Sequence, residues 1–167
     1  MQEIARDLGF ILGWIVGMMC IAYIVEVFMK IIVCVDNEYG MMFNNRRQSR
    51  DRKVIHDIIH KIEGVLWIGE YSKELFVDFF DDADKSVEIR VDNDMLNKAK
   101  DEDWCFVEDI SLTGYEDYVS EVIMYNWNKL YPADRYMNID MDKFNMIDSK
   151  EIKGFSHDII LRNVYVK

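Results

Sequence analysis

The sequence has little proline and little cysteine, and both scarcities bound the kind of protein that it encodes. One proline occurs in 167 residues and aromatic residues make up 13% of the chain, which excludes a disordered linker and a collagen-like chain. Three cysteines, with no Cys-x-x-Cys pair, exclude a disulfide-dense scaffold and the usual structural zinc sites. The length corresponds to one globular domain with at most one appendage.

Basic residues are also in the minority. Lys and Arg total 20 against 31 Asp and Glu, which gives a formal net charge of −11, and most of the excess lies between Lys73 and Glu121. Such a surface repels the phosphates of nucleic acids and attracts basic proteins, so we expect a basic protein partner and no nucleic acid. The alternative is that the acidic clusters are solvated turns. The candidate partner-binding residues are Asp78, Asp81, Asp82, Asp84, Asp101, Glu102 and Asp103.

A long apolar run opens the chain. No residue from Leu8 to Val25 is charged, and the apolar character continues with two charged interruptions to Val35. A helix needs about 20 apolar residues to cross a bilayer, so we predict that residues 1–35 hold a single membrane-spanning helix behind a short tail. A cleaved signal peptide and a buried helix of a globular core are the alternatives.

Three glycines, Gly9, Gly13 and Gly17, recur every four residues within this run. In a lipid environment this spacing favours close helix–helix packing, so we expect a glycine zipper that forms homo-oligomers. The basic residues concentrate after the run, between Arg46 and Lys53, which places the rest of the chain in the cytoplasm by the positive-inside rule. We interpret residues 36–53 as a basic juxtamembrane linker that is attracted to anionic lipid.

The remaining residues, 54–167, show the patterns of a small α+β domain. A stripe of isoleucines at helical spacing predicts a helix over 49–63, and a Thr-x-x-Glu capping pattern at Thr113 predicts another over 113–130. Apolar and alternating runs predict strands over 65–71, 75–80, 87–91, 104–112 and 159–166. We therefore predict an antiparallel sheet of about five strands packed with two helices.

Two histidines one helical turn apart give the sequence its most suggestive chemical pattern. His56 and His60 have the spacing of a zinc-binding HExxH helix, but Asp57 replaces the glutamate that serves as the base. Both histidines also lie away from the isoleucine stripe and therefore face solvent. With His157 as a third ligand they are weak metal candidates, and we expect neither a bound metal nor a cofactor.

The sequence contains no nucleophile elbow, phosphate-binding loop, dinucleotide-binding glycine pattern or kinase signature. We therefore expect a protein that is not an enzyme. The first hypothesis is a single-pass membrane-anchored interaction protein whose acidic domain binds a basic protein, as an inhibitor or immunity protein does. The second is an oligomeric, holin-like pore effector that assembles through its glycine zipper. A weaker third option is a metal-dependent hydrolase that uses the three histidines.

Overall fold

The computed structural model describes residues 28–80 and 86–167. Ten strands dominate this part of the chain, with two α-helices and four short 3-10 helices between them. The strands are β1 (Met29–Val35), β2 (Gly40–Phe43), β3 (Arg46–Arg47), β4 (Gly64–Ile68), β5 (Val87–Val91), β6 (Trp104–Val107), β7 (Val119–Asn126), β8 (Arg135–Tyr136), β9 (Asn145–Ile152) and β10 (Ile160–Val166). The helices are α2 (Arg52–Lys61), η1 (Glu70–Leu75), η2 (Val77–Phe79), α3 (Met95–Lys98), η3 (Glu116–Tyr118) and η4 (Met141–Lys143).

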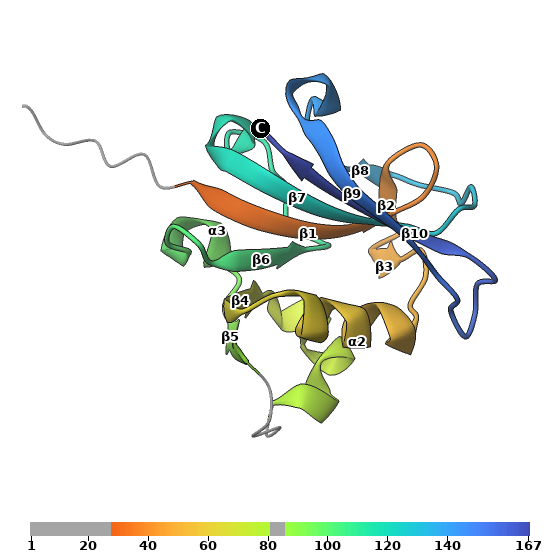
Figure 1. Ribbon diagram of the computed structural model, residues 1–167, viewed down its shortest axis with the longest axis horizontal. Helices are drawn as coiled ribbons and strands as arrows, with labels where there is room; N and C mark the ends of the chain where they lie inside the picture. Colours follow the sequence, from red (N-terminus) through yellow and green to blue (C-terminus); the bar gives the residue numbers. More distant parts are fainter. Residues whose placement is uncertain (1–27, 81–85) are drawn as a thin grey trace, which may run out of the picture.

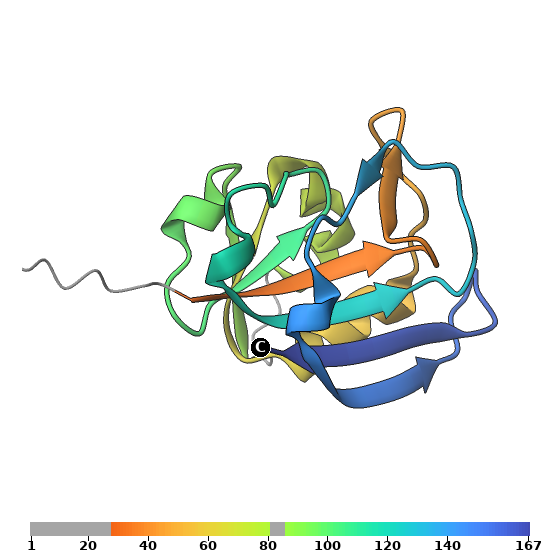
Figure 2. The same cartoon turned by 90° about the horizontal axis from the view of Figure 1, so that it is seen from above.

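Seven of the strands form one mixed sheet in the order β5-β4-β6-β1-β7-β10-β9 (Figure 1). The first five of these run parallel, whereas β10 is antiparallel to both β7 and β9. Figure 2 shows the strands side by side, with β1 in the middle of the sheet. A second, three-stranded sheet in the order β3-β2-β8 stands beside the carboxyl end of β1. The predicted antiparallel sheet of about five strands with two helices is therefore wrong.

The end of the predicted membrane segment is the central strand of the sheet. β1 pairs with β6 on one side and with β7 on the other, and its side chains are buried or half-buried throughout. A parallel strand that is covered on both faces needs apolar residues at successive positions, so its sequence continues the apolar run without an alternating pattern. A membrane-spanning segment that reaches Val35 is therefore wrong.

The rest of the predicted span, including Gly9, Gly13 and Gly17, lies outside the described residues. Over residues 28–80 and 86–167, no helix is long and apolar enough to cross a bilayer. This finding and the mixed sheet overturn the hypothesis of a single-pass membrane protein, in both its interaction-protein form and its pore-effector form.

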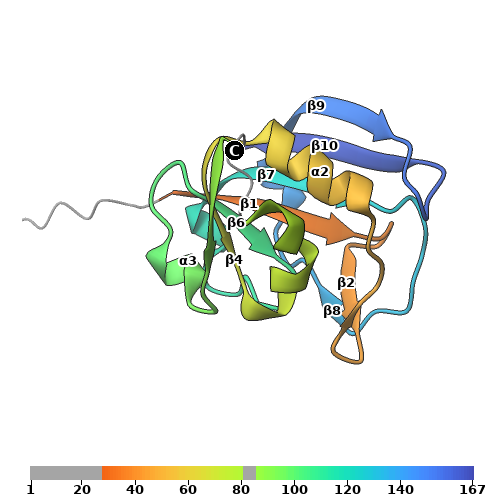
Figure 3. The ribbon, with the colours of Figure 1, turned by 90° about the horizontal axis from the view of Figure 1, so that it is seen from below.

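The helix α2 covers one face of the sheet (Figure 3). Its isoleucine stripe packs in a core with β1, β6 and β7, and this part of the predicted helix over 49–63 is confirmed. The helix begins after Asp51, whose side chain accepts a hydrogen bond from the backbone N–H of Lys53. On the opposite face, α3 and the segments after β6 and β7 pack against alternate side chains of β1.

Four other predicted elements give a mixed result. The strands predicted over 87–91 and 159–166 are confirmed by β5 and β10, apart from one terminal residue in β10. The helix predicted over 113–130 is wrong, because this region holds η3 and the eight-residue strand β7. The strand predicted over 75–80 is also wrong, since the chain there forms the end of η1 and η2.

Candidate functional site

The carboxyl end of β6 leads into a closed cluster of charged side chains. Glu108 is 7% exposed; one of its carboxylate oxygens accepts a hydrogen bond from Arg47 Nε at 2.8 Å and the other accepts one from Ser72 Oγ at 2.8 Å. The guanidinium of Arg47 also binds Glu74 at 2.7 Å and the carbonyl oxygen of Tyr71 at 3.0 Å. Burial raises the pKa of Glu108, while Arg47 and Ser72 oppose that rise.

A second closed cluster joins the start of α2 to the turn between β9 and β10. One oxygen of Asp51 caps the helix, and the other accepts hydrogen bonds from the backbone N–H groups of Phe155 and Ser156, at 2.7 and 2.8 Å, and from Ser156 Oγ at 3.0 Å. Burial alone would raise the pKa of Asp51, but these hydrogen bonds lower it below its usual value. This carboxylate is therefore a structural hub that holds two distant segments together.

His157 extends this second cluster into the core. Its ring is 4% exposed and stacks on Trp127, with ring centroids 4.9 Å apart. Its Nε2 lies 2.8 Å from the hydroxyl of Tyr131, and its Nδ1 lies 3.0 Å from Ser156 Oγ. Burial and the nearby Lys129 lower the pKa of His157, and Asp51 opposes this effect. The imidazole is a packed link between the turn and the loop after β7.

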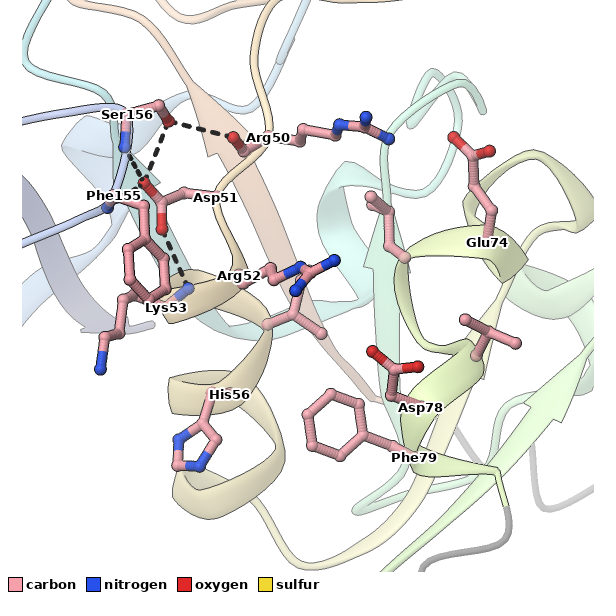
Figure 4. A pocket seen from close by; sticks show the side chains of 13 residues that line it. Arg50, Asp51, Arg52, Lys53, His56, Glu74, Asp78, Phe79, Phe155 and Ser156 are labelled. Atoms are coloured by element: carbon pink, nitrogen blue, oxygen red, sulfur yellow. Dashed lines mark hydrogen bonds between the residues drawn. The ribbon is translucent and has the colours of Figure 1, made fainter.

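A pocket opens between α2 and the 3-10 helices η1 and η2 (Figure 4). Its volume is about 830 Å³, which is within the range of small-molecule sites. We call it the α2–η pocket. Its lining residues are Arg50, Asp51, Arg52, Lys53, Ile55, His56, Glu74, Leu75, Val77, Asp78, Phe79, Phe155 and Ser156.

The two walls of the α2–η pocket differ in character. Arg50 and Arg52 reach from the start of α2 toward the opposite wall, which carries Glu74, Asp78 and Phe79 (Figure 4). Neither arginine forms an ion pair with any residue in 28–80 or 86–167. The floor and the η wall add apolar groups, among them Ile55 and Leu75. Because they have no ion pair within the described residues, these two guanidinium groups can bind an anionic ligand, and the apolar groups can contact its body.

The structure distributes the predicted acidic residues over different places. Asp78 lines the α2–η pocket. Asp101 accepts a hydrogen bond from the backbone of Phe28, and Asp103 accepts one from Trp67 Nε1 at 2.9 Å. Glu102 forms an ion pair with Lys30. Asp81, Asp82 and Asp84 lie outside the described residues. These contacts give Asp101, Glu102 and Asp103 intramolecular roles, and their binding to a basic partner stays a prediction.

The three histidines also separate. His56 and His60 stack on each other with centroids 3.9 Å apart, and His60 Nδ1 lies 2.7 Å from the carbonyl oxygen of His56. His157 instead packs on Trp127, as described above. Within the described residues, no group of three or more His, Cys, Asp or Glu side chains is placed to hold a metal ion. The hypothesis of a three-histidine hydrolase therefore gains no support from the geometry.

Arg50 and Arg52 were visible in the sequence, but as part of the basic run assigned to a lipid-facing linker. The signal that could have separated them is the capped helix start, because the N-cap Asp51 is buried while Arg50 and Arg52 on either side of it are exposed. Arg47, five residues before Arg52, enters a buried cluster instead. The sequence alone does not distinguish a paired arginine from an unpaired one within such a run.

No protein-family model matches the sequence, and no curated protein does either. Among solved structures, the chain is similar to a dihydrofolate reductase from Enterococcus faecalis, solved in complex with NADP(H) and RAB-propyl. The TM-score is 0.54 and the identity is 8%, over 83% of this chain and 95% of that chain. At this identity the likeness shows the fold alone, which is the mixed seven-stranded sheet described above.

Proposed function

We propose that the chain is a ligand-binding protein that holds a small organic anion in the α2–η pocket. The observation that carries the proposal is the pair of unpaired arginines, Arg50 and Arg52, on one wall of an 830 Å³ pocket. In a chain with a net charge of −11, carboxylates are plentiful, and Glu74 and Asp78 line the same pocket, yet neither arginine forms an ion pair within the described residues. Guanidinium groups bind carboxylates and phosphates in bidentate geometry, so either group suits this wall.

The body of the ligand is expected to be flat and apolar. Phe79 projects into the pocket opposite His56, and the two rings lie 6.4 Å apart in an edge arrangement. Ile55, Leu75 and Val77 supply further apolar surface. Asp78, on the same wall as Phe79, can accept a hydrogen bond from an amine of the ligand. An aromatic carboxylate or phosphate with an amino group therefore matches both walls.

The similar reductase was solved with NADP(H), and a dinucleotide requires particular groups at its binding site. In open sheets with parallel strands, such ligands bind outside the carboxyl ends of the strands, with the diphosphate on a glycine-rich turn and a helix N-terminus. Here β6 is followed by Glu108 and Asp109, and the next helix is the three-residue η3. Two carboxylates repel a diphosphate, and Arg47 is already bound to Glu74 and Glu108. The residues do not fit NADP(H), and we propose binding without reduction.

The test is isothermal titration calorimetry with three probes: dihydrofolate, 4-aminobenzoyl-glutamate and benzyl phosphate. We expect at least one of them to bind, and we expect Arg52→Gln to weaken that binding by about tenfold through loss of a charge-assisted hydrogen bond. Arg46→Gln is the matched control, because Arg46 is exposed, unpaired within the described residues, and lines a different pocket. Failure of all three anions to bind, or equal binding by Arg52→Gln and the wild type, would contradict the proposal.

A further inference from the structure

The strand β5 ends the sheet on the side opposite β9. It pairs in parallel with β4, from Gly64 opposite Val87 to Ile68 opposite Val91. No other strand of the described residues pairs with it, so its outer row of backbone N–H and C=O groups has no ladder partner there. Natural proteins usually protect such an edge or use it to bind another strand.

The sequence of β5 is complementary to itself when it is read backwards. The five residues are Val-Glu-Ile-Arg-Val, so apolar residues occupy the first, third and fifth positions and opposite charges occupy the second and fourth. If a second copy runs antiparallel with Ile89 facing Ile89 of the partner subunit, each Val87 lies opposite a Val91. In the same register each Glu88 lies opposite an Arg90. Every cross-strand pair in this register is therefore a favourable one.

We propose that β5 is a docking strand for a second copy of this chain, which pairs antiparallel about a two-fold axis at Ile89. The partner subunit is identified by this charge and apolar complementarity, since a strand of another sequence would match β5 only by chance. Such pairing joins two seven-stranded sheets into one continuous sheet. The proposal does not depend on the ligand of the α2–η pocket.

The side chains of β5 are placed for this pairing. Glu88 and Arg90 bind each other through two hydrogen bonds, at 2.8 and 3.1 Å, and their side chains are 62% and 40% exposed. They lie side by side on one face. A partner strand would therefore place its own Arg90 opposite Glu88 and its own Glu88 opposite Arg90, so that each charge would have an opposite charge on both neighbouring sides. On the other face, Ile89 and Val91 are only partly buried, so a second strand would cover apolar surface that the monomer leaves in contact with water.

The opposite edge strand, β9, lacks this property although it is longer and more exposed. Antiparallel self-pairing about Ser149 would place Asp148 opposite Lys150, but it would also place the exposed Ile147 opposite Glu151. Asp148 is also held by Arg162 at 2.9 Å within the chain. β9 therefore combines one favourable charge pair with an unfavourable apolar–charged pair. Of the two edges of the sheet, β5 is the better match for a second copy.

The test is sedimentation velocity of the full chain at a series of concentrations. We expect concentration-dependent self-association of the wild type, since a five-residue strand pair gives a small interface. Glu88→Arg and Arg90→Glu should each weaken it by about tenfold or more, because each places like charges opposite each other. An equimolar mixture of the two variants should associate again as a heterodimer, and so should the double variant with both charges exchanged. Lys150→Glu on β9 is the control and should leave association unchanged.

Three results of the sedimentation experiment would overturn the proposal. A wild type that stays monomeric, single variants that associate as the wild type does, or a mixture that fails to recover would each overturn it. Loss of association in Lys150→Glu alone would assign the interface to β9 instead. Circular dichroism of each variant verifies the fold, and hydrogen exchange of residues 87–91 provides a second readout. Their amides should be protected in the wild type at high concentration and should exchange faster in Arg90→Glu.

Discussion

Arg47 and the pair Arg50 and Arg52 are only a few residues apart in the chain, but their surroundings are opposite. Arg47 has a side chain that is 10% exposed and binds two carboxylates, a carbonyl oxygen and the ring face of Tyr71. Arg50 and Arg52 are exposed and line the α2–η pocket without an ion pair in the described residues. The first environment is closed and fixes the structure, whereas the second is open and suits a ligand. The proposed function therefore rests on unpaired charge around a cavity and not on the total charge.

The difference between the two groups follows from where the chain places them. Arg47 ends the short strand β3, so its side chain lies over the carboxyl end of β6 where Glu108 is buried. Arg50 and Arg52 flank Asp51, whose carboxylate is used by the turn between β9 and β10 and by the helix start. The Asp51 carboxylate is therefore directed at these donors and forms no ion pair with Arg50 or Arg52.

The largest effect is expected for Arg47→Met. This change leaves Glu108 buried without its cation, and breaking a buried ion pair in this way costs about 3 kcal/mol of the free energy of unfolding. Urea denaturation followed by tryptophan fluorescence measures the loss. Arg46→Met is the control, because Arg46 is exposed and forms no ion pair in the described residues. If both variants unfolded at the same urea concentration, the closed cluster would contribute nothing to stability.

Asp51→Ala should cost somewhat less, about 2 kcal/mol of the free energy of unfolding. The variant loses the helix cap and leaves the N–H groups of Phe155 and Ser156 without their acceptor. Asp51→Ser keeps a hydroxyl that can cap α2 but cannot reach both segments, so its midpoint in urea should lie between those of the wild type and Asp51→Ala. Equal stability of all three proteins would refute the hub role of this carboxylate.

The pH dependence of stability should report on His157. Burial lowers the pKa of this histidine in the folded state, so the unfolded state binds a proton first as the pH falls. Its contribution to stability is thus complete above the unfolded pKa of about 6.5 and is lost progressively as the pH falls below that value. We expect the melting temperature to fall between pH 7 and pH 5 and expect His157→Gln to flatten this slope. An unchanged slope in His157→Gln would assign the effect to other groups.

The smallest effect on stability is expected for Arg52→Gln. An exposed side chain without an ion pair in the described residues should change the free energy of unfolding by no more than about 0.5 kcal/mol. The same variant should bind the organic anions about tenfold more weakly, as proposed above. A large loss of stability would show that Arg52 belongs to the closed type of environment and would remove the distinction between the two groups.

The parts of the fold that could be predicted from the sequence have an unambiguous period. The isoleucines of α2 repeat at helical spacing, and Val87, Ile89 and Val91 alternate with charged residues. β1 has no such period because both of its faces are buried, and an apolar run before it suggested a membrane helix. In β7 the buried residues Val122–Tyr125 are consecutive, which fits a buried helix as well as a central strand.

The candidate site was harder to predict than the fold. The acidic residues were chosen for their charge, but Asp103 binds the indole of Trp67 and Asp101 binds the backbone of Phe28. These partners lie 36 and 73 residues away in sequence, so no local pattern reveals them. The basic run was recognised, but the pairing of Arg47 depends on Glu108 and Glu74, which lie 61 and 27 residues away in sequence.

The place of β1 in the sheet has a consequence for how the molecule is made. Its two neighbours, β6 and β7, begin only at Trp104 and Val119, so the middle strand of the sheet is synthesised long before either partner exists. Loop closure over such distances slows folding, and β1 is an apolar segment that has to stay unpaired until then. A nascent chain of this protein should therefore need shielding of residues 29–35 on the ribosome until the second half of the sheet emerges.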